Sequence, residues 1–238
     1  MPMRHRYKDQ IMQTLTSYGI ILLDNTGRVL MARRRNSFAL TDLITGPYPS
    51  HDRLVYLMKH MTRREQRMLA ECPKFDTLWT QMRCRSNRLD YNRRKLVYDT
   101  LAPVLPKYIS DYPSQYCSGE WGFPKGRPMR SEIPVDTAIR EMKEETGIGP
   151  ESYNIQASGP HYEECHVTRG IKFKSKYFIA VVDPDGPPIS LDFQCDEISK
   201  ITWVRVEDSK TFIRSYYLEK LAIMEDLPNR PIGQEYTQ

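Results

Sequence analysis

Apolar and polar positions along the chain first predict a pair of strands. Residues 18–23 form a short apolar run, which is typical of a buried strand, and residues 29–32 form a second one. The sequence Asp-Asn-Thr-Gly at residues 24–27 lies between them and favours a tight turn. Residues 17–40 are therefore predicted to form two strands joined by a turn.

The apolar spacing then becomes helical between residues 41 and 115. Pro73 and the prolines at 103–106 separate the helical stretches. A segment of 75 residues is far too long for an ordinary loop, so we predict an inserted all-helical subdomain over residues 41–115. The pattern is carried by Leu54, Leu57, Met58 and Met61, followed by predicted helices over residues 63–71, 75–85 and 93–101.

The last third of the chain returns to a strand pattern. Residues 161–183 are predicted to be strands, and residues 183–188 form a loop rich in proline and glycine. A final strand is predicted over residues 198–206, and a helix that packs on the sheet over residues 211–226. The alternation typical of a half-buried sheet is carried by Ile171, Phe173, Tyr177, Ile179 and Val181.

A further helix is predicted between Pro134 and Gly147. Proline suits the first turn of a helix, and glycine can end one in a left-handed conformation. Val135, Ile139 and Met142 recur at i, i+4 and i+7, which predicts a buried helical stripe.

Three glutamates lie together on this helix. Glu141, Glu144 and Glu145 have the spacing i, i+3, i+4, so their carboxylates project from one face. They repel one another at neutral pH, and Arg140 offsets that repulsion only in part. Clustered carboxylates without a fixed counter-charge favour a hard cation such as Mg²⁺ or Mn²⁺. An ordinary solvated acidic helix is the alternative interpretation of these glutamates taken by themselves.

The flanking residues favour the functional interpretation. Gly126 and Glu132 precede a stretch that reads Arg140-Glu141-Met142-x-Glu144-Glu145-x-Gly147-Ile148. Together they resemble the Nudix box, G-x5-E-x7-R-E-U-x-E-E-x-G-U with U an apolar residue, and every defined position is filled. Nudix enzymes use a divalent metal, held by the glutamates, to help water cleave a diphosphate linked to another group. The resemblance implies an α+β fold, namely a Nudix α/β/α sandwich with a mixed sheet, formed by residues 1–40 and 116–238.

The segment before the box narrows the resemblance. It reads Trp121-Gly122-Phe123-Pro124-Lys125-Gly126, which is similar to Nudix enzymes acting on mRNA caps, dinucleoside polyphosphates and diphosphoinositol polyphosphates. Residues 37–40, 75–79 and 197–203, with the helical insertion, resemble the mRNA-decapping Nudix enzymes of large cytoplasmic DNA viruses. This resemblance implies removal of the 7-methylguanosine cap of mRNA, releasing 7-methyl-GDP and a 5′-monophosphate RNA. Hydrolysis of diphosphoinositol or dinucleoside polyphosphates is the alternative.

The resemblance also implies a metal site. Glu141, Glu144 and Glu145, with the carbonyl of Gly126, are expected to bind Mg²⁺ or Mn²⁺, and Glu144 and Glu145 are the first choices as direct ligands. Glu145 or Glu197 is expected to act as the general base. The neighbouring acids Glu163, Glu164 and Asp196 compete with Glu197 for that role.

Two cations are placed beside the phosphate chain. Lys125 is expected to meet the phosphates, because a lysine ammonium is a mobile point charge. Arg140 is assigned to the same phosphate region, where its main expected role is to orient a glutamate. Glu132 is expected to stabilise the junction between loop and helix.

The distribution of charge along the chain favours a nucleic-acid partner. The chain carries a net charge of +5, and residues 41–115 contain thirteen basic and eight acidic residues, an excess of the same size. Within this segment, arginines and a lysine are interleaved with Tyr91, which is a reasonable nucleic-acid footprint. A solubilising helical face with salt bridges to Asp90 is an equally good interpretation of the segment by itself. The proposed RNA-binding residues are Arg83, Arg85, Arg88, Arg93, Arg94 and Lys95.

A decapping enzyme also needs a partner for the cap base. Because 7-methylguanine carries positive charge, an aromatic ring can bind it by stacking and cation–π attraction. The candidates are Phe38, Tyr48, Tyr116 and Tyr177, and the sequence does not select among them. A catalytically silent RNA-binding module is a further possibility, against which the intact glutamates argue.

The composition excludes several other classes. Apolar runs stay well below the roughly 18 residues that a membrane span needs. The basic N-terminus lacks the apolar stretch of a signal peptide. Five cysteines without a C-x-x-C pair suggest neither a zinc site nor a disulfide framework, so we expect a reducing compartment, the cytoplasm, and the host cytoplasm if the protein is viral.

Overall fold

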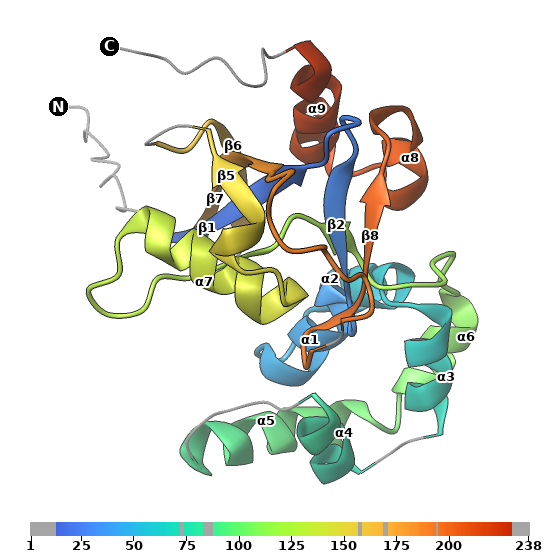
Figure 1. Ribbon diagram of the computed structural model, residues 1–238. Helices are drawn as coiled ribbons and strands as arrows, with labels where there is room; N and C mark the ends of the chain where they lie inside the picture. The colour runs from blue at the N-terminus through green and yellow to red at the C-terminus, as the bar shows by residue number, and fades with distance from the viewer. Residues whose placement is uncertain are drawn as a thin grey trace, which may run out of the picture.

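A mixed sheet with helices on both faces forms the larger part of the molecule. The structure is a computed structural model that describes residues 13–71, 74–82, 88–156, 159–168, 171–193 and 195–229. Figure 1 shows α7 along one face of the sheet, α8 and α9 on the other side, and the helices α1 to α6 gathered at one edge. The predicted α+β fold class is confirmed.

The sheet is built around two long parallel strands. β1 (Thr14–Leu23) pairs in parallel with β7 (Ile171–Val182) over its whole length. On the other side, β2 (Val29–Arg34) pairs antiparallel with β1 and with β8 (Ile198–Val204). The shorter strands are β3 (Trp121–Gly122), β4 (Lys125–Gly126), β5 (Tyr153–Ile155) and β6 (Tyr162–Thr168).

The central strands are covered on both faces. In β7, Tyr177 and Ile179 pack toward α9, whereas Phe178 and Ala180 pack toward α7. The predicted strand over this region is confirmed, but the expectation that only alternate residues are buried is wrong. Strands between two helical layers bury both sets of side chains, so their sequence becomes continuously apolar.

Helix α7 (Pro134–Thr146) forms as predicted between its proline and its glycine. Gly147 adopts φ 76°, the left-handed conformation that ends the helix. Ala138 and Met142 are fully buried against the sheet. This packing fixes the rotation of the helix and therefore the direction in which its glutamates point.

The predicted C-terminal helix is two helices. α8 (Ser209–Phe212) ends before a turn, and α9 (Leu218–Asp226) begins after it. Ile213 and Arg214 in the turn are both buried. Their tertiary contacts interrupt a pattern that looked continuous, and this is why the single helix over residues 211–226 is wrong. Short 3-10 turns complete the chain as η1 (Pro150–Ser152), η2 (Val206–Asp208) and η3 (Leu227–Asn229).

The segment between β2 and β3 is helical. Helix α1 begins at Phe38, earlier than residue 41, because the Ser37 hydroxyl accepts a hydrogen bond from the Leu40 N–H and caps it. α6 was not predicted: Pro106 stands in its first turn, where proline is tolerated, and starts the helix instead of separating two others. The helices are α1 (Phe38–Thr45), α2 (His51–His60), α3 (Arg63–Ala70), α4 (Phe75–Gln81), α5 (Arg88–Leu101) and α6 (Leu105–Asp111).

These helices pack around apolar residues of their own. The cluster runs in sequence from Ala39 to Leu105 and is distinct from the two clusters on the faces of the sheet. Its fully buried members include Leu57, Met58 and Tyr98. In the part of the chain that the structure describes, no helix is long and apolar enough to cross a membrane.

Candidate functional site

The glutamates of α7 lie against the loop that carries Gly126. A Cβ atom added at Gly126 would lie 2.1 Å from Oε1 of Glu141. A side chain at this position would therefore displace the carboxylate. The glycine is required because the backbone of β4 approaches α7 so closely.

Arg140 connects the loop to the acidic face of the helix. Its Nε lies 2.7 Å from Glu132, and its Nη1 lies 2.7 Å from Glu141 and 2.9 Å from Glu144. The guanidinium lowers the pKa of Glu132 to about 2. One arginine thus contacts three carboxylates, one in the loop and two in α7.

Glu145 is the most enclosed of the three clustered glutamates. Its Oε2 accepts a hydrogen bond of 3.1 Å from the backbone N–H of Lys125. Burial raises the pKa of Glu145 to about 7, although the charge of Lys125 opposes that shift. Burial, with the nearby charge of Lys220, lowers the pKa of the Lys125 ammonium. A carboxylate with a pKa near neutrality can exchange protons under physiological conditions.

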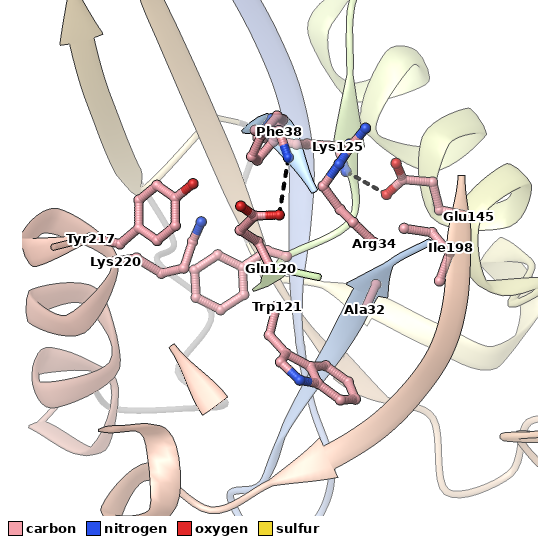
Figure 2. A pocket seen from close by; sticks show the side chains of 12 residues that line it. Ala32, Arg34, Phe38, Glu120, Trp121, Lys125, Glu145, Ile198, Tyr217 and Lys220 are labelled. Atoms are coloured by element: carbon pink, nitrogen blue, oxygen red, sulfur yellow. Dashed lines mark hydrogen bonds between the residues drawn. The ribbon is translucent and has the colours of Figure 1, made fainter. Parts of the chain in front are cut away.

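Glu145 and Lys125 both line a small pocket that is partly open to solvent. Figure 2 shows Glu145 entering from the α7 side and Lys220 with Tyr217 from the opposite side. The pocket combines three cations with several aromatic rings. Its lining comprises Ala32, Arg34, Phe38, Glu120, Trp121, Gly122, Phe123, Lys125, Glu145, Ile198, Tyr217 and Lys220.

Two of these cations were not found from the sequence. Arg34 ends β2, and its guanidinium lies 4.3 Å from the centre of the Phe38 ring. The Nε atom of Arg34 is buried and has no hydrogen-bond partner among the described residues. Lys220 comes from α9 and lies 3.3 Å from Glu164. A run of arginines at the end of β2 is visible in the sequence, but no pattern indicated that α9 would bring a lysine here.

The acidic residues proposed as general base outside the box differ in exposure and in their ion-pair partners. Glu197 is 67% exposed, and its carboxylate lies 3.9 Å from Arg34. It is also near enough to Glu141 to raise the pKa of that carboxyl, for which burial is the larger cause. Glu163 and Glu164 instead form ion pairs with Lys174 and Lys220. Glu197 therefore lies beside the box glutamates.

The four aromatic residues predicted as partners of the cap base differ in how accessible their rings are. Tyr177 is fully buried and packs edge-on against Phe123, so its ring is closed to any ligand and this candidate is wrong. Tyr116 is covered by the guanidinium of Arg214 at 3.9 Å. Phe38 is 46% exposed and lines the pocket, whereas Tyr48 is exposed elsewhere.

The basic helix α5 is partly neutralised by its own aspartates. Arg94 lies 3.1 Å from Asp90, and Lys95 lies 2.7 Å from Asp99. Arg93 is exposed. The predicted residues Arg83 and Arg85 lie outside the described residues, and so does the side chain of Arg88.

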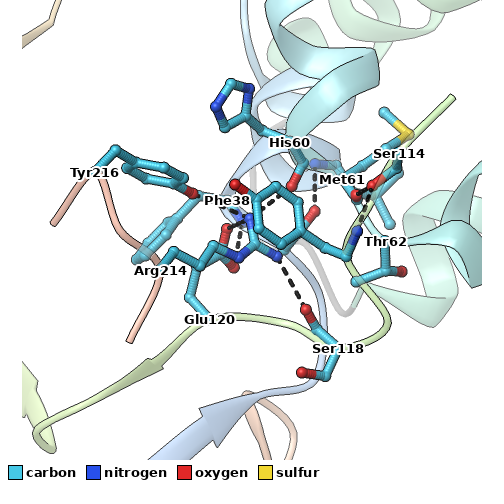
Figure 3. A network of polar contacts seen from close by, with 12 residues as sticks. Phe38, His60, Met61, Thr62, Ser114, Ser118, Glu120, Arg214 and Tyr216 are labelled. Atoms are coloured by element: carbon cyan, nitrogen blue, oxygen red, sulfur yellow. Dashed lines mark hydrogen bonds and ion pairs between the residues drawn. The ribbon is translucent and has the colours of Figure 1, made fainter. Parts of the chain in front are cut away.

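The helices of the insert are joined to the sheet by a buried ion pair. Arg214 lies 2.8 Å from Glu120, and their side chains are 5% and 3% exposed. Arg214 also donates to the carbonyl oxygens of His60 in α2 and of Ser118, as Figure 3 shows. Glu120 in turn accepts from the backbone N–H of Phe38, the first residue of α1. The pair thus sets how α1 and α2 meet the wall of the pocket.

A metal would meet only oxygen donors at the box. Within the described ranges, no group of three or more acidic, histidine or cysteine side chains is already arranged around a metal position. Glu141 and Glu144 are occupied by Arg140 instead. The backbone of Gly126 nevertheless approaches the Glu141 carboxylate closely, and hard divalent cations prefer carboxylate and backbone oxygen donors.

Comparison with known proteins connects these observations to a family. Residues 109–221 match the model of the NUDIX domain. The chain is 28% identical over 226 residues to a putative mRNA-decapping protein of Acanthamoeba polyphaga mimivirus, covering 82% of this chain and 63% of that protein. It is 29% identical over 218 residues to the mRNA-decapping protein g5R of African swine fever virus (isolate Pig/Kenya/KEN-50/1950), covering 82% of this chain and 87% of g5R.

A cellular protein shows a more local similarity. The chain is 33% identical over 159 residues to mRNA decapping complex subunit 2 of Schizosaccharomyces pombe, covering 61% of this chain and 19% of that protein. This chain therefore spans a small part of the yeast protein and less than two thirds of the mimivirus protein.

Proposed function

We propose that this chain is a Nudix hydrolase that cleaves the pyrophosphate bridge of the mRNA cap, because residues 109–221 match the NUDIX domain and the chain is similar to viral mRNA-decapping proteins. The products are 7-methyl-GDP and an RNA with a 5′-monophosphate. The observation that carries the proposal is the position of Glu145, which belongs to the box and also lines the pocket with Lys125 and Phe38. Acid, cation and aromatic ring are what a methylated base linked to phosphates requires.

The proposed cofactor is Mg²⁺ or Mn²⁺. Glu141, Glu144, Glu145 and the carbonyl of Gly126 are the proposed ligands, and their hard oxygen atoms fit either ion. When bound, the metal lowers the pKa of water and neutralises phosphate charge. Arg140 holds two of the ligands, Glu141 and Glu144, in place without the ion.

Each remaining residue is given a role by its surroundings. Glu145 is the proposed proton acceptor, because its carboxylate lines the pocket and accepts a hydrogen bond from the backbone N–H of Lys125. Glu197 is the second choice for this role. Lys125 is proposed to bind the phosphate chain, with Arg140 at its edge. Phe38 is proposed to stack on the cap base, which its exposed position in the pocket supports.

The RNA body is proposed to bind to the helical insert. We keep the division into a Nudix domain of residues 1–40 and 116–238 and an inserted subdomain of residues 41–115, which the separate apolar cluster of the helices supports. Phosphate contacts from the basic segment provide affinity without sequence preference. The proposed RNA-binding residues remain Arg83, Arg85, Arg88, Arg93, Arg94 and Lys95. The proposed location is the cytoplasm, and the host cytoplasm if the protein is viral.

A second candidate substrate is a compact polyanion. Arg34, Lys125 and Lys220 line one pocket, and three cations in so small a volume suit a diphosphoinositol or dinucleoside polyphosphate. Such a substrate would not need the basic helix α5. The two candidates are therefore distinguished by how strongly hydrolysis depends on the RNA body.

Cap-labelled RNA tests the proposal directly. With Mg²⁺ or Mn²⁺, the wild type is expected to release labelled 7-methyl-GDP, and Glu144→Gln is expected to release little or none. Glu207→Gln is the matched control, because Glu207 is 71% exposed and lies outside the box. If capped RNA stays intact in every sample while the wild type hydrolyses a dinucleoside polyphosphate, decapping is contradicted and the second candidate is favoured.

A further inference from the structure

An aromatic pair lies on the strands beside the site and has no role in the chemistry described so far. His166 of β6 stands opposite Phe173 of β7 in the antiparallel register. Their rings are stacked, with centroids 5.0 Å apart and an angle of 9° between the planes. His166 is exposed and Phe173 is partly buried. We call this pair the His166–Phe173 platform.

The platform is on the side of the sheet that faces the pocket lysines. His166 and Glu164 are two residues apart in β6, so their side chains point to the same face about 7 Å from each other. Glu164 lies 3.3 Å from Lys220, which lines the pocket. The positive charges of Lys125 and Lys220 both act on His166, as do the negative charges of Glu164 and Glu219. The two lysines therefore adjoin both the pocket and the platform.

The molecule thus presents two aromatic surfaces that share one pair of cations. Phe38 lies in the pocket with Lys125 and Lys220, and the platform lies next to the same lysines outside the pocket lining. A cap structure has a matching composition, because it contains two nucleosides joined by a short chain of phosphates. Phosphates fit the lysines, and each base needs an aromatic surface.

We propose that the His166–Phe173 platform stacks on the first transcribed base of capped RNA, while the methylated base occupies the pocket at Phe38. This inference rests on the proposed decapping function. Stacking on an aromatic ring is available to every base, so the platform would accept any first nucleotide. It would also distinguish a cap joined to RNA from free 7-methyl-GDP, the product, which has no second base.

The platform can be tested with two probes that differ only in the second base. One is a cap dinucleotide with adenine on the second ribose, and the other has the same ribose without a base. Methylene groups replace the bridging oxygens in both, so that Mg²⁺ can be present without cleavage. The wild type is expected to bind the adenine probe about 5- to 150-fold more tightly, the range for one stacked base.

The variant is His166→Leu combined with Phe173→Leu, which removes the rings and keeps apolar side chains on both strands. It is expected to bind the two probes equally, with its affinity for the base-free probe unchanged. Val167→Ala is the matched control, because Val167 is 57% exposed, lies in the same strand and points to the opposite face. This control is expected to keep the wild-type preference.

The possible outcomes separate the two proposals. A preference for adenine that survives in the double variant overturns the platform, and so does equal binding of both probes by the wild type. Either result leaves decapping intact if the wild type cleaves cap-labelled RNA. If the pair acts only as a cross-strand contact, the variant lowers thermal stability without changing the ratio of the two affinities, and this result also overturns the inference. Failure of the wild type to bind either probe also overturns the platform, whereas decapping itself is overturned only if cap-labelled RNA stays intact.

Discussion

Helices α5 and α7 have similar lengths and both carry clustered charge, but they use that charge differently. In α7, Arg140 contacts Glu132 of the preceding loop as well as two glutamates of its own helix. In α5, Arg94 and Lys95 each contact the aspartate four residues away in the same helix. The charges of α7 connect separate segments of the chain, whereas the charges of α5 that form ion pairs do so locally.

The apolar residues of the two helices show the same contrast. α7 buries Ala138 and Met142 against the sheet. α5 buries Tyr98 but leaves Leu89 81% and Leu96 70% exposed. A charge pattern is therefore informative about function when its partners come from elsewhere in the fold. A pattern completed within one helix is equally compatible with a solvated surface.

The largest expected effect concerns the buried ion pair between Glu120 and Arg214, whose hydrogen bonds reach Phe38 of α1 and His60 of α2. Glu120→Gln leaves the buried guanidinium of Arg214 without its counter-charge, and loss of one partner of a buried pair costs about 3–5 kcal/mol. Urea unfolding at neutral pH measures the change in the free energy of unfolding. Lys107→Gln breaks an exposed pair of α6 and should leave the midpoint unchanged. An equally small shift of the urea midpoint in both variants would contradict a stabilising role of the buried pair.

Gly126→Ala tests the close approach of the loop backbone to the Glu141 carboxylate of α7. The new Cβ would lie 2.1 Å from the Glu141 carboxylate, so the carboxylate or the loop must move. We expect a loss of about 1–3 kcal/mol in stability from overpacking, together with a large loss of hydrolysis. Gly159→Ala serves as the control, because nothing lies within 4 Å of its added Cβ. Full activity of Gly126→Ala would contradict the assigned geometry.

The charge of α5 can be tested one residue at a time. Arg93 is exposed, whereas Arg94 is held by Asp90, so Arg93→Gln should weaken RNA binding more than Arg94→Gln. Each lost phosphate contact reduces the slope of log K against log salt by about 0.7 for single strands. Titration of RNA at several salt concentrations measures this slope. Unchanged slopes in both variants, with unchanged affinity, would remove α5 from the RNA-binding surface.

Hydrolysis of a dinucleoside polyphosphate, which has no RNA body, is the control for that experiment. Neither substitution touches the pocket, so this rate should stay at the wild-type value. A parallel loss of dinucleotide hydrolysis would show that the variants disturb the fold instead of the RNA contact.

The smallest effect is a pH dependence. Arg140 lowers the pKa of Glu132 from 4.5 to about 2, so the folded protein binds this proton less readily than the unfolded chain. The stability that this contact contributes is present above about pH 4.5 and is lost as the pH falls toward 2. Glu132→Gln should therefore be less stable than the wild type at pH 6, with the difference shrinking below pH 4.5. A constant difference between pH 6 and pH 3 would contradict this assignment.

Local patterns predicted much of the sheet and the box helix. The turn at Gly27 and the end of α7 at Gly147 both require positive φ, which glycine adopts readily. The sequence predicted the strand β7 but not that both of its faces are buried, because the residues of one strand do not reveal what covers its second face. The break between α8 and α9 was missed because buried contacts of Arg214 override a continuous helical pattern.

The box glutamates were identified from their spacing and Lys125 from the resemblance of the segment before the box, and the pocket around them was not predicted. Residue order is sufficient to place Glu141, Glu144 and Glu145 on one face, because helical geometry depends on near neighbours. Arg34 and Lys220 come from opposite ends of the chain and meet only because β2 and α9 flank the same loop. Burial likewise arises from packing. It raises the pKa of Glu145 to about 7, whereas the neighbouring Glu144 of the same sequence pattern is exposed.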